Sequence, residues 1–253
     1  SLPLADDDRG AEGSTAARLW GRLSAEEPTV EGLAALDAAL VLLADHELAS
    51  STLAARVAAS TWADIYRVVM AGLATLGGAL HGGVGDGVLT FLKETAEVGP
   101  ERAVGERLRS GSEIPGTGHL VYTRSDPRAD ALLARVRTAY PTHPILEAAD
   151  QVLRAARGEN PRSFPNVDLA LAALVGSAAM VTGAAEAIFA TARMAGFIAH
   201  GIEEYEHRLR FRIRAAYAGP EPGSVTPIRT STPGEPWIRR GSGDASEGSP
   251  GRQ

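Results

Sequence analysis

The chain contains no cysteine in 253 residues, which excludes disulfide bonds, a thiolate nucleophile and metal sites built on thiolates. Aromatic residues are also scarce, at 5%, although hydrophobic residues reach 44%. The apolar content is therefore mostly alanine, leucine and valine, a mixture that favours helices. Because a cysteine-free chain fits a reducing compartment, we expect a cytoplasmic protein.

Basic residues are fewer than acidic ones: the chain has 25 Lys and Arg and 31 Asp and Glu, which gives a net charge of −6. An acidic surface repels phosphate polyanions, so we expect no nucleic-acid binding. The longest uncharged stretch, residues 169–185, is short for a membrane span and is bounded by Asp168 and Glu186. The N-terminus lacks the basic and hydrophobic regions of a secretory signal, and we expect no membrane contact.

Helical patterns fill most of the chain, and we find no convincing alternation of β-branched residues, so we expect an all-α fold. Order is expected to begin near Pro28, after a flexible segment 1–28. Residues 219–253 hold 7 Gly, 6 Pro and 5 Ser and should form a disordered tail. The predicted helices cover residues 30–47, 51–76, 88–96, 101–109, 126–140, 144–157, a long stretch from 165, and 184–208.

Three histidines lie in polar or glycine-rich segments, namely His46, His81 and His119. A single histidine of this kind is usually structural, but glycine permits close backbone approach, so a ring there can face a ligand. No two histidines stand at i,i+4 with a carboxylate between them, so we expect no metal site. Phosphate-cradling, nucleophile-elbow and dinucleotide motifs are absent as well.

Charged residues also occur where apolar ones would be expected. Asp168 stands in the first turn of a predicted helix, where ordinary N-terminal capping would explain it. Arg193 lies inside an apolar stretch, and a buried arginine needs an anionic partner. Arg128 at a helix start and Arg212 in a basic run could be simple surface residues.

Six segments in this order resemble the citrate synthase family, and the resemblance covers roughly residues 33–220, the C-terminal half to two-thirds of the family's length. Any one segment would be weak, but six in the family's order with fitting gaps are highly specific. The segments are Ala44-Asp45-His46-Glu47-Leu48, Leu80-His81-Gly82-Gly83, Gly116-Thr117-Gly118-His119-Leu120-Val121-Tyr122, Asp126-Pro127-Arg128, Pro165-Asn166-Val167-Asp168, and Phe189-Ala190-Thr191-Ala192-Arg193 followed by Gly196 to His200.

The resemblance implies that Asp168 removes a proton from the acetyl thioester while His81 hydrogen-bonds the thioester oxygen. It implies that His119 polarises and then protonates the ketone of oxaloacetate. Coenzyme A would lie against the peptide from Ile114 to His119, mainly at the backbone of Ile114, Gly116 and Gly118. No bound cofactor is implied. The residues implied to hold oxaloacetate are His46, Arg128, Arg193 and Arg212, the last donated by the second subunit of a homodimer.

The family's architecture implies a large helical domain with an inserted small helical domain that closes over it. On this chain the large domain would comprise residues 29–83 and 184–218, and the small domain residues 84–183. We therefore expect a citrate synthase that condenses acetyl-CoA with oxaloacetate. Propionyl-CoA as the acyl donor, giving 2-methylcitrate, and the reverse cleavage of a citryl thioester are left open. A truncated inactive subunit that pairs with a full-length synthase is also left open.

Overall fold

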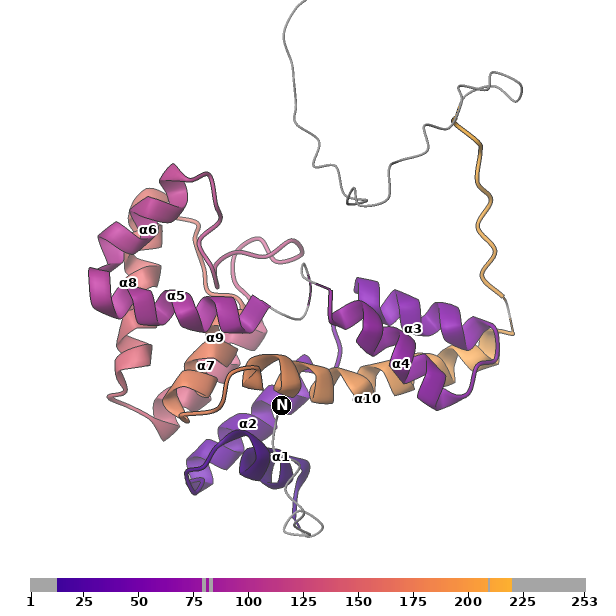
Figure 1. Cartoon of the computed structure of the whole chain (residues 1–253), viewed down its shortest axis with the longest axis horizontal. Helices are drawn as coiled ribbons and strands as arrows, with labels where there is room; N and C mark the ends of the chain where they lie inside the picture. Colours follow the sequence, from indigo (N-terminus) through magenta and orange to yellow (C-terminus); the bar gives the residue numbers. More distant parts are fainter. Residues whose placement is uncertain (1–12, 79–80, 82–83, 209, 220–253) are drawn as a thin grey trace, which may run out of the picture. The chain divides into compact units, whose positions relative to one another are not determined.

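The computed structural model describes residues 13–78, 81, 84–208 and 210–219 (Figure 1). Every regular element in this part of the chain is an α-helix, and the only extended pairing there is an isolated bridge between Thr117 and Pro165. The all-α prediction is therefore confirmed. The helices are α1 (Thr15–Leu23), α2 (Val30–Leu43), α3 (Ser50–Ser60), α4 (Ile65–Leu76), α5 (Val84–Val98), α6 (Pro100–Arg109), α7 (Pro127–Ala139), α8 (Pro144–Glu159), α9 (Val167–Ser177) and α10 (Ala184–His207).

Helix α1 corrects the expectation that order begins near Pro28. Ser14 caps the helix by accepting a hydrogen bond from the backbone N–H of Ala17. Trp20 is buried, and its indole N–H donates to the carbonyl of Glu26 at 2.8 Å. The helix has only nine residues and is not hydrophobic on average. Because so short a helix is not stable alone, its stability depends on burying one face against α2.

The predicted helix over residues 51–76 is two helices, α3 and α4. Trp62 adopts a left-handed backbone conformation with φ of 62°, which no continuous helix allows. Asp64 then starts the second helix, because its carboxylate accepts a hydrogen bond from the backbone N–H of Arg67. This capping turn is a local signal that the apolar periodicity obscured.

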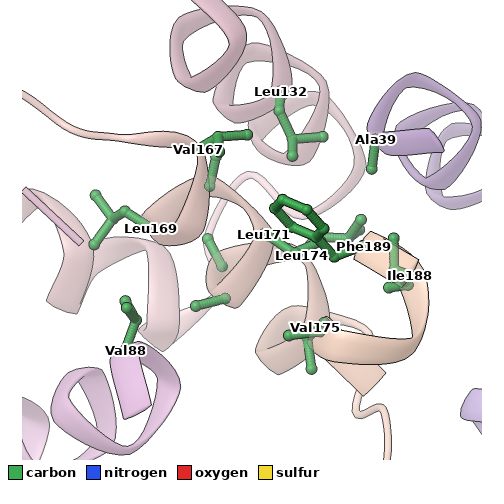
Figure 2. Close-up of a cluster of buried hydrophobic side chains, with 14 of the residues drawn as sticks. Ala39, Val88, Leu132, Val167, Leu169, Leu171, Leu174, Val175, Ile188 and Phe189 are labelled. Atoms are coloured by element: carbon green, nitrogen blue, oxygen red, sulfur yellow. The ribbon is translucent and has the colours of Figure 1, made fainter. Parts of the chain in front are cut away.

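Helix α9 forms the centre of the core. Almost every residue from Leu169 to Val175 is buried, as expected of a helix that is apolar on all sides. Figure 2 shows Leu171 and Leu174 next to Ile188 and Phe189, which come from the start of α10. Helices α5, α7, α8 and α10 pack around α9, so its first turn has a fixed position in the core.

Helix α10 connects this core to the N-terminal helices. It contacts α2, α3, α4, α5 and α9 along its 24 residues (Figure 1). Gly196 lies so close to the carbonyl oxygen of Ala44, just after α2, that a Cβ atom would collide with the backbone. Glycine is therefore required at this crossing.

The described residues up to Phe211 form one compact unit, and Arg212 begins a second. The proposed division into segments 29–83, 84–183 and 184–218 stays a prediction. Most of the predicted tail, residues 220–253, lies outside the described residues, as do residues 79–80 and 82–83 of the glycine-rich turn. None of the helices in the described part of the chain has the length and apolar character that crossing a membrane requires.

Candidate active site

The loop that carries His119 is fastened to the start of α9. The backbone N–H of Gly118 donates to the carbonyl of Phe164 at 2.9 Å, and that of Asn166 donates to the carbonyl of Gly116 at 3.0 Å. The Asn166 side chain adds a third bond, to the carbonyl of Gly118 at 3.1 Å. Both glycines have positive φ values, 80° and 73°. The loop therefore brings His119 next to the helix that carries Asp168.

The hydrogen bonds of His119 define its tautomer. Its Nδ1 atom accepts from the backbone N–H of Val121 at 2.9 Å and of Tyr122 at 3.3 Å. With Nδ1 accepting two backbone N–H groups, the proton of the neutral ring is on Nε2. The 3.3 Å approach of Nη2 of Arg128 to Nε2 is then a contact between two donors and not a hydrogen bond. Burial and the positive charge of Arg128 lower the pKa of His119, which keeps the ring neutral near pH 7. The N–H groups of His119 Nε2 and Arg128 Nη2 thus lie side by side, an arrangement that suits binding of one acceptor oxygen.

Arg128 is held by Asp126, a residue whose part in the site the sequence did not reveal. The carboxylate of Asp126 is fully buried and accepts from Nε and Nη2 of Arg128 at 3.0 and 2.9 Å. It also accepts from the backbone N–H of Val167 at 3.0 Å, which ties α7 to α9. Burial would raise the pKa of Asp126, but the bonds from Arg128 outweigh it and lower the pKa overall. Within the described part of the chain, Nη1 of Arg128 has no hydrogen-bond partner.

His46 lies against His119 from the turn that follows α2. The two ring centroids are 5.1 Å apart at an interplanar angle of 88°, and the ring of Tyr122 lies 5.6 Å from that of His46. Burial lowers the pKa of His46, and the charge of Arg128 lowers it further. This ring is therefore also neutral near pH 7, and Arg128 and Arg193 are close enough for their charges to act on it.

Arg193 is a buried cation on α10, only 1% exposed. Its Nε–H donates to the carbonyl of Leu43 at 2.8 Å, and its guanidinium lies 4.9 Å from the centroid of Phe189. Burial lowers the pKa of Arg193 to about 10, so the group stays charged at neutral pH. Among the described residues it forms no ion pair within 4.0 Å, which suits a site for an anionic ligand.

His81 lies in the turn after α4. Its Nε2 atom is 2.8 Å from Oγ of the buried Ser51, and its ring packs edge-on to Phe189 at 6.4 Å. Burial lowers the pKa of His81, and the charge of Arg193 lowers it further. Sequence inspection missed Ser51, because a serine at a helix start is ordinary and its partner lies thirty residues further along the chain.

Asp168 does not cap α9. That task falls to Asn166, whose Oδ1 accepts from the backbone N–H groups of Asp168 and Leu169 at 3.1 and 3.2 Å. The Asp168 carboxylate has no hydrogen-bond donor among the described residues. Burial raises its pKa to about 6, opposed by the charge of Arg128 and assisted by that of Asp126. The capping explanation of Asp168 is therefore wrong, and the carboxylate is left free for proton transfer.

The predicted residues thus fall into neighbouring groups within the first unit. His46, His119 and Arg128 contact one another through Tyr122, while His81 and Arg193 meet at the ring of Phe189. The charge of Arg128 acts on the pKa of Asp168, but among the described residues no hydrogen bond joins Asp168 to His81 or His119. Arg212 is exposed and belongs to the second unit, so it is not among these groups.

The remaining predicted positions concern coenzyme A and metals. Ile114 is 9% exposed and is the first residue of the loop. Its carbonyl already accepts hydrogen bonds from the hydroxyl and the backbone N–H of Thr117. Across the residues with described positions, no three His, Asp or Glu side chains gather as a metal site would require. A cavity of about 420 Å³ is lined by Trp62, Ala63, Asp64, Ile65, Tyr205 and Arg208 and includes none of the predicted site residues.

Comparison with known proteins gives a consistent result. The family model "Citrate synthase, C-terminal domain" matches residues 3–215. Citrate synthase 2 of Bacillus subtilis strain 168 is 36% identical over 210 residues, which are 81% of this chain and 56% of that protein. The chain therefore spans little more than half the length of this relative.

Two solved structures share the fold. Citryl-CoA lyase from Hydrogenobacter thermophilus has a TM-score of 0.75 at 27% identity, and the match covers 84% of this chain and 86% of the lyase. Citrate synthase from Thermoplasma acidophilum, in a ternary complex with carboxymethyl coenzyme A and oxaloacetate, has a TM-score of 0.71 at 30% identity over 86% of this chain and 60% of the synthase. On the family match, the sequence identity and the shared fold, this chain belongs to the citrate synthase family.

Proposed function

We propose that this protein joins the methyl carbon of acetyl-CoA to the ketone carbon of oxaloacetate, yielding citrate and free coenzyme A. The observation that carries the proposal is that Asp168 and His119 both lie near Arg128, and that two backbone N–H groups donate to Nδ1 of His119. Asp168 is a carboxylate with a pKa of about 6 and no hydrogen-bond donor among the described residues, while His119 is neutral with its proton on Nε2. A base and a neutral donor in one site are what enolisation and carbonyl addition need.

In the first step, Asp168 takes a proton from the thioester methyl group. A carboxylate alone is too weak a base for so weak an acid, so a donor must share the charge that develops on the thioester oxygen. His81 is the donor that we assign to this oxygen. When the Ser51 hydroxyl donates to Nε2, the ring proton lies on Nδ1, and Nδ1–H is left for the substrate. The product of this step is an enol, because Nδ1–H of His81 passes its proton to the thioester oxygen; this proton returns to His81 when the carbon–carbon bond forms.

In the second step, the enol carbon attacks the ketone carbon of oxaloacetate. The electron pair of the carbonyl moves to its oxygen, which takes the proton from Nε2 of His119, and citryl-CoA results. Arg128 lies next to that nitrogen and stabilises the developing negative charge. Water then attacks the citryl thioester and gives one proton back to His119, while the carbon–sulfur bond breaks and the leaving thiolate takes the proton held by Asp168. The new carboxyl group ionises, and citrate and coenzyme A leave.

Oxaloacetate is a dianion, and the site offers it cationic donors. Arg193 is buried without an ion pair in the described part of the chain, and Nη1 of Arg128 is likewise unused there. Guanidinium groups match carboxylates in charge and shape, and His46 can add a neutral donor. We assign Arg212 to the active site of a second copy, so the proposed assembly is a homodimer.

Coenzyme A is proposed to bind at the loop from Ile114 to His119 as a co-substrate. Backbone N–H and C=O groups of a glycine-rich loop can approach an extended ligand closely. Gly116 and Gly118 both have positive φ values, and nothing lies within 4 Å of the position that a Cβ would take at Gly118, so the backbone there is open to a ligand. The proposed chemistry uses only side chains and the thioester itself.

The decisive experiment measures coenzyme A release with a thiol reagent in the presence of oxaloacetate and either acetyl-CoA or propionyl-CoA. Release that depends on oxaloacetate supports the proposal, and the ratio of kcat/KM for the two thioesters separates citrate from 2-methylcitrate synthesis. Discrimination of one methylene is expected to be modest, about 10–200-fold. Absence of release with both thioesters would refute the synthase proposal.

Cleavage of citryl-CoA is the second candidate, and the match to 86% of the citryl-CoA lyase chain favours it specifically. The same residues would act in reverse, with His119 accepting the hydroxyl proton and Asp168 returning a proton to the enol carbon. Incubation with citryl-CoA should then yield acetyl-CoA and oxaloacetate faster than citrate and coenzyme A. Inactivity in both directions would instead support the alternative of a non-catalytic subunit that pairs with a full-length synthase.

A further inference from the structure

Helix α10 holds the end of α2 at two consecutive residues. Arg193 donates from Nε to the carbonyl of Leu43 at 2.8 Å. One turn later, Gly196 packs directly against the carbonyl of Ala44. Positions 193 and 196 lie on the same face of a helix, so α10 approaches the chain along one line here. Arg193, which we assign to oxaloacetate binding, is therefore held in position against the end of α2 and the turn that follows it.

The next residue of the turn is held in the same way, by His200. Its Nε2 atom lies 2.9 Å from Oδ1 of Asp45, and its Nδ1 atom lies 2.9 Å from Nη1 of Arg56. Arginine can only donate, so Nδ1 of His200 is an acceptor and the proton of the neutral ring points at Asp45. The second oxygen of Asp45 accepts from the backbone N–H of Glu47 at 3.2 Å. Both oxygens of the Asp45 carboxylate are thus hydrogen-bonded, and the backbone is held by this side chain at the residue before His46 and at the residue after it.

Arg56, at the other end of this chain of hydrogen bonds, is itself held in place by two ion pairs. Its side chain is 11% exposed and is paired with Glu203 and with the buried Glu204, whose Oε2 lies 2.7 Å from Nη2. Arg56 comes from α3, whereas both glutamates come from α10. The Arg56–His200–Asp45 chain is therefore fixed at one end by two carboxylates and ends at the residue before His46.

Stability alone does not explain this arrangement. The side chain of Asp45 is 54% exposed, and an ion pair that open to solvent adds little to folding. Asp45 also acts on the site electrostatically. Burial lowers the pKa of Arg193, and the negative charge of Asp45 raises it in part. Burial raises the pKa of Asp45, but the hydrogen bond with His200 and those from backbone N–H groups together outweigh burial and lower the pKa overall.

We propose that His200 is a positioning residue that orients Asp45 and, through it, the ring of His46 and the guanidinium of Arg193 for binding oxaloacetate. This inference rests on the proposed function. In this proposal His200 acts through Asp45 and not on the substrate directly. Its contribution is to hold a neighbouring carboxylate in one orientation, which reduces the reorganisation that binding would otherwise require.

The test compares His200→Ala with His200→Gln. Alanine removes both hydrogen bonds, whereas the glutamine amide can donate to Asp45 and accept from Arg56. We expect His200→Ala to weaken oxaloacetate binding, measured by calorimetry, about tenfold, and to leave the KM for acetyl-CoA unchanged. His200→Gln should restore binding to within about twofold of the original protein. Equal binding by all three proteins, or equal weakening in both variants, would overturn the proposal.

Two further variants guard against a trivial outcome. Asp45→Asn keeps the size of the side chain but removes its charge, so it should reproduce the weaker binding even where His200→Ala fails to fold. Glu106→Gln is the matched control, because it breaks an exposed pair with Arg102 on α6 and should not change binding. Binding by Asp45→Asn at the original strength would also contradict the proposal.

A spectroscopic measurement separates failure of this inference from failure of the proposed function. NMR signals of the His46 ring should shift in His200→Ala and return in His200→Gln, with no ligand present. If the unaltered protein binds no oxaloacetate, the proposed function fails while this shift still decides the positioning role. Unchanged His46 signals in His200→Ala would refute that role regardless of activity.

Discussion

Nε2 of His81 lies 2.8 Å from Oγ of Ser51, joining the turn after α4 to the first turn of α3. Ser51 is fully buried, so its hydroxyl has little alternative but to bond within the protein. This contact fixes the ring of His81 and selects which of its nitrogens is available to a substrate.

Replacing Ser51 with alanine should therefore slow the reaction without emptying the site. We expect kcat to fall about tenfold, since one orienting hydrogen bond is lost, while oxaloacetate binding is retained. Steady-state kinetics of coenzyme A release measure the effect. Ser60→Ala is the matched control, because Ser60 is also a buried serine of α3 whose hydroxyl bonds only backbone groups, those of Val57 and Phe211. Similar losses in both variants would point to a packing effect in α3.

Asp168→Asn should abolish the base while preserving the shape of the site. Turnover is expected to fall about 10²–10⁴-fold, with oxaloacetate affinity nearly unchanged, because the carboxylate acts on the thioester. Single-turnover kinetics with calorimetry of oxaloacetate binding check both expectations. A variant that turns over at the original rate would show that another group is the base.

The same substitution should also change how stability depends on pH. The folded pKa of Asp168 is about 6, above the value of about 3.9 for an unfolded aspartate. The proton is thus held more tightly in the folded state, and the associated stability is full below pH 4 and lost as pH rises through 6. Relative to Asp168→Asn, the original protein should lose about 1 kcal/mol between pH 5 and pH 7.5. Urea denaturation at both values measures this difference, and a constant difference would contradict the raised pKa.

Gly116 and Gly118 offer a matched pair of alanine substitutions. Both have positive φ, so either alanine should cost about 1 kcal/mol of backbone strain. At Gly116 a Cβ would also lie 2.7 Å from Cδ1 of Leu169, whereas at Gly118 nothing lies within 4 Å. Gly116→Ala should therefore destabilise the protein by about 1–3 kcal/mol more than Gly118→Ala, as measured by chemical denaturation. Equal destabilisation would mean that the loop can move away from α9.

Local signals in the sequence predicted much of the backbone. Pro127 and Pro144 stand at the first positions of α7 and α8, as their fixed φ angle favours. The segments around His46, His119 and Arg128 predicted residues that do contact one another in the structure. Helix α1 and the break before Asp64 were missed, because one depends on packing and the other on a short capping turn within a continuous apolar pattern.

The sequence by itself determined the helical class, through composition and periodicity, and the family, through the resemblance of its short motifs. Through the same resemblance it predicted which residues form the candidate site. Only the tertiary structure decided what state those residues are in. It gave the capping role to Asn166, left Asp168 half-buried and without a hydrogen-bond donor among the described residues, and favoured the proton of His119 on Nε2. Such properties arise from burial and from partners distant along the chain, and neither is encoded in the neighbouring residues.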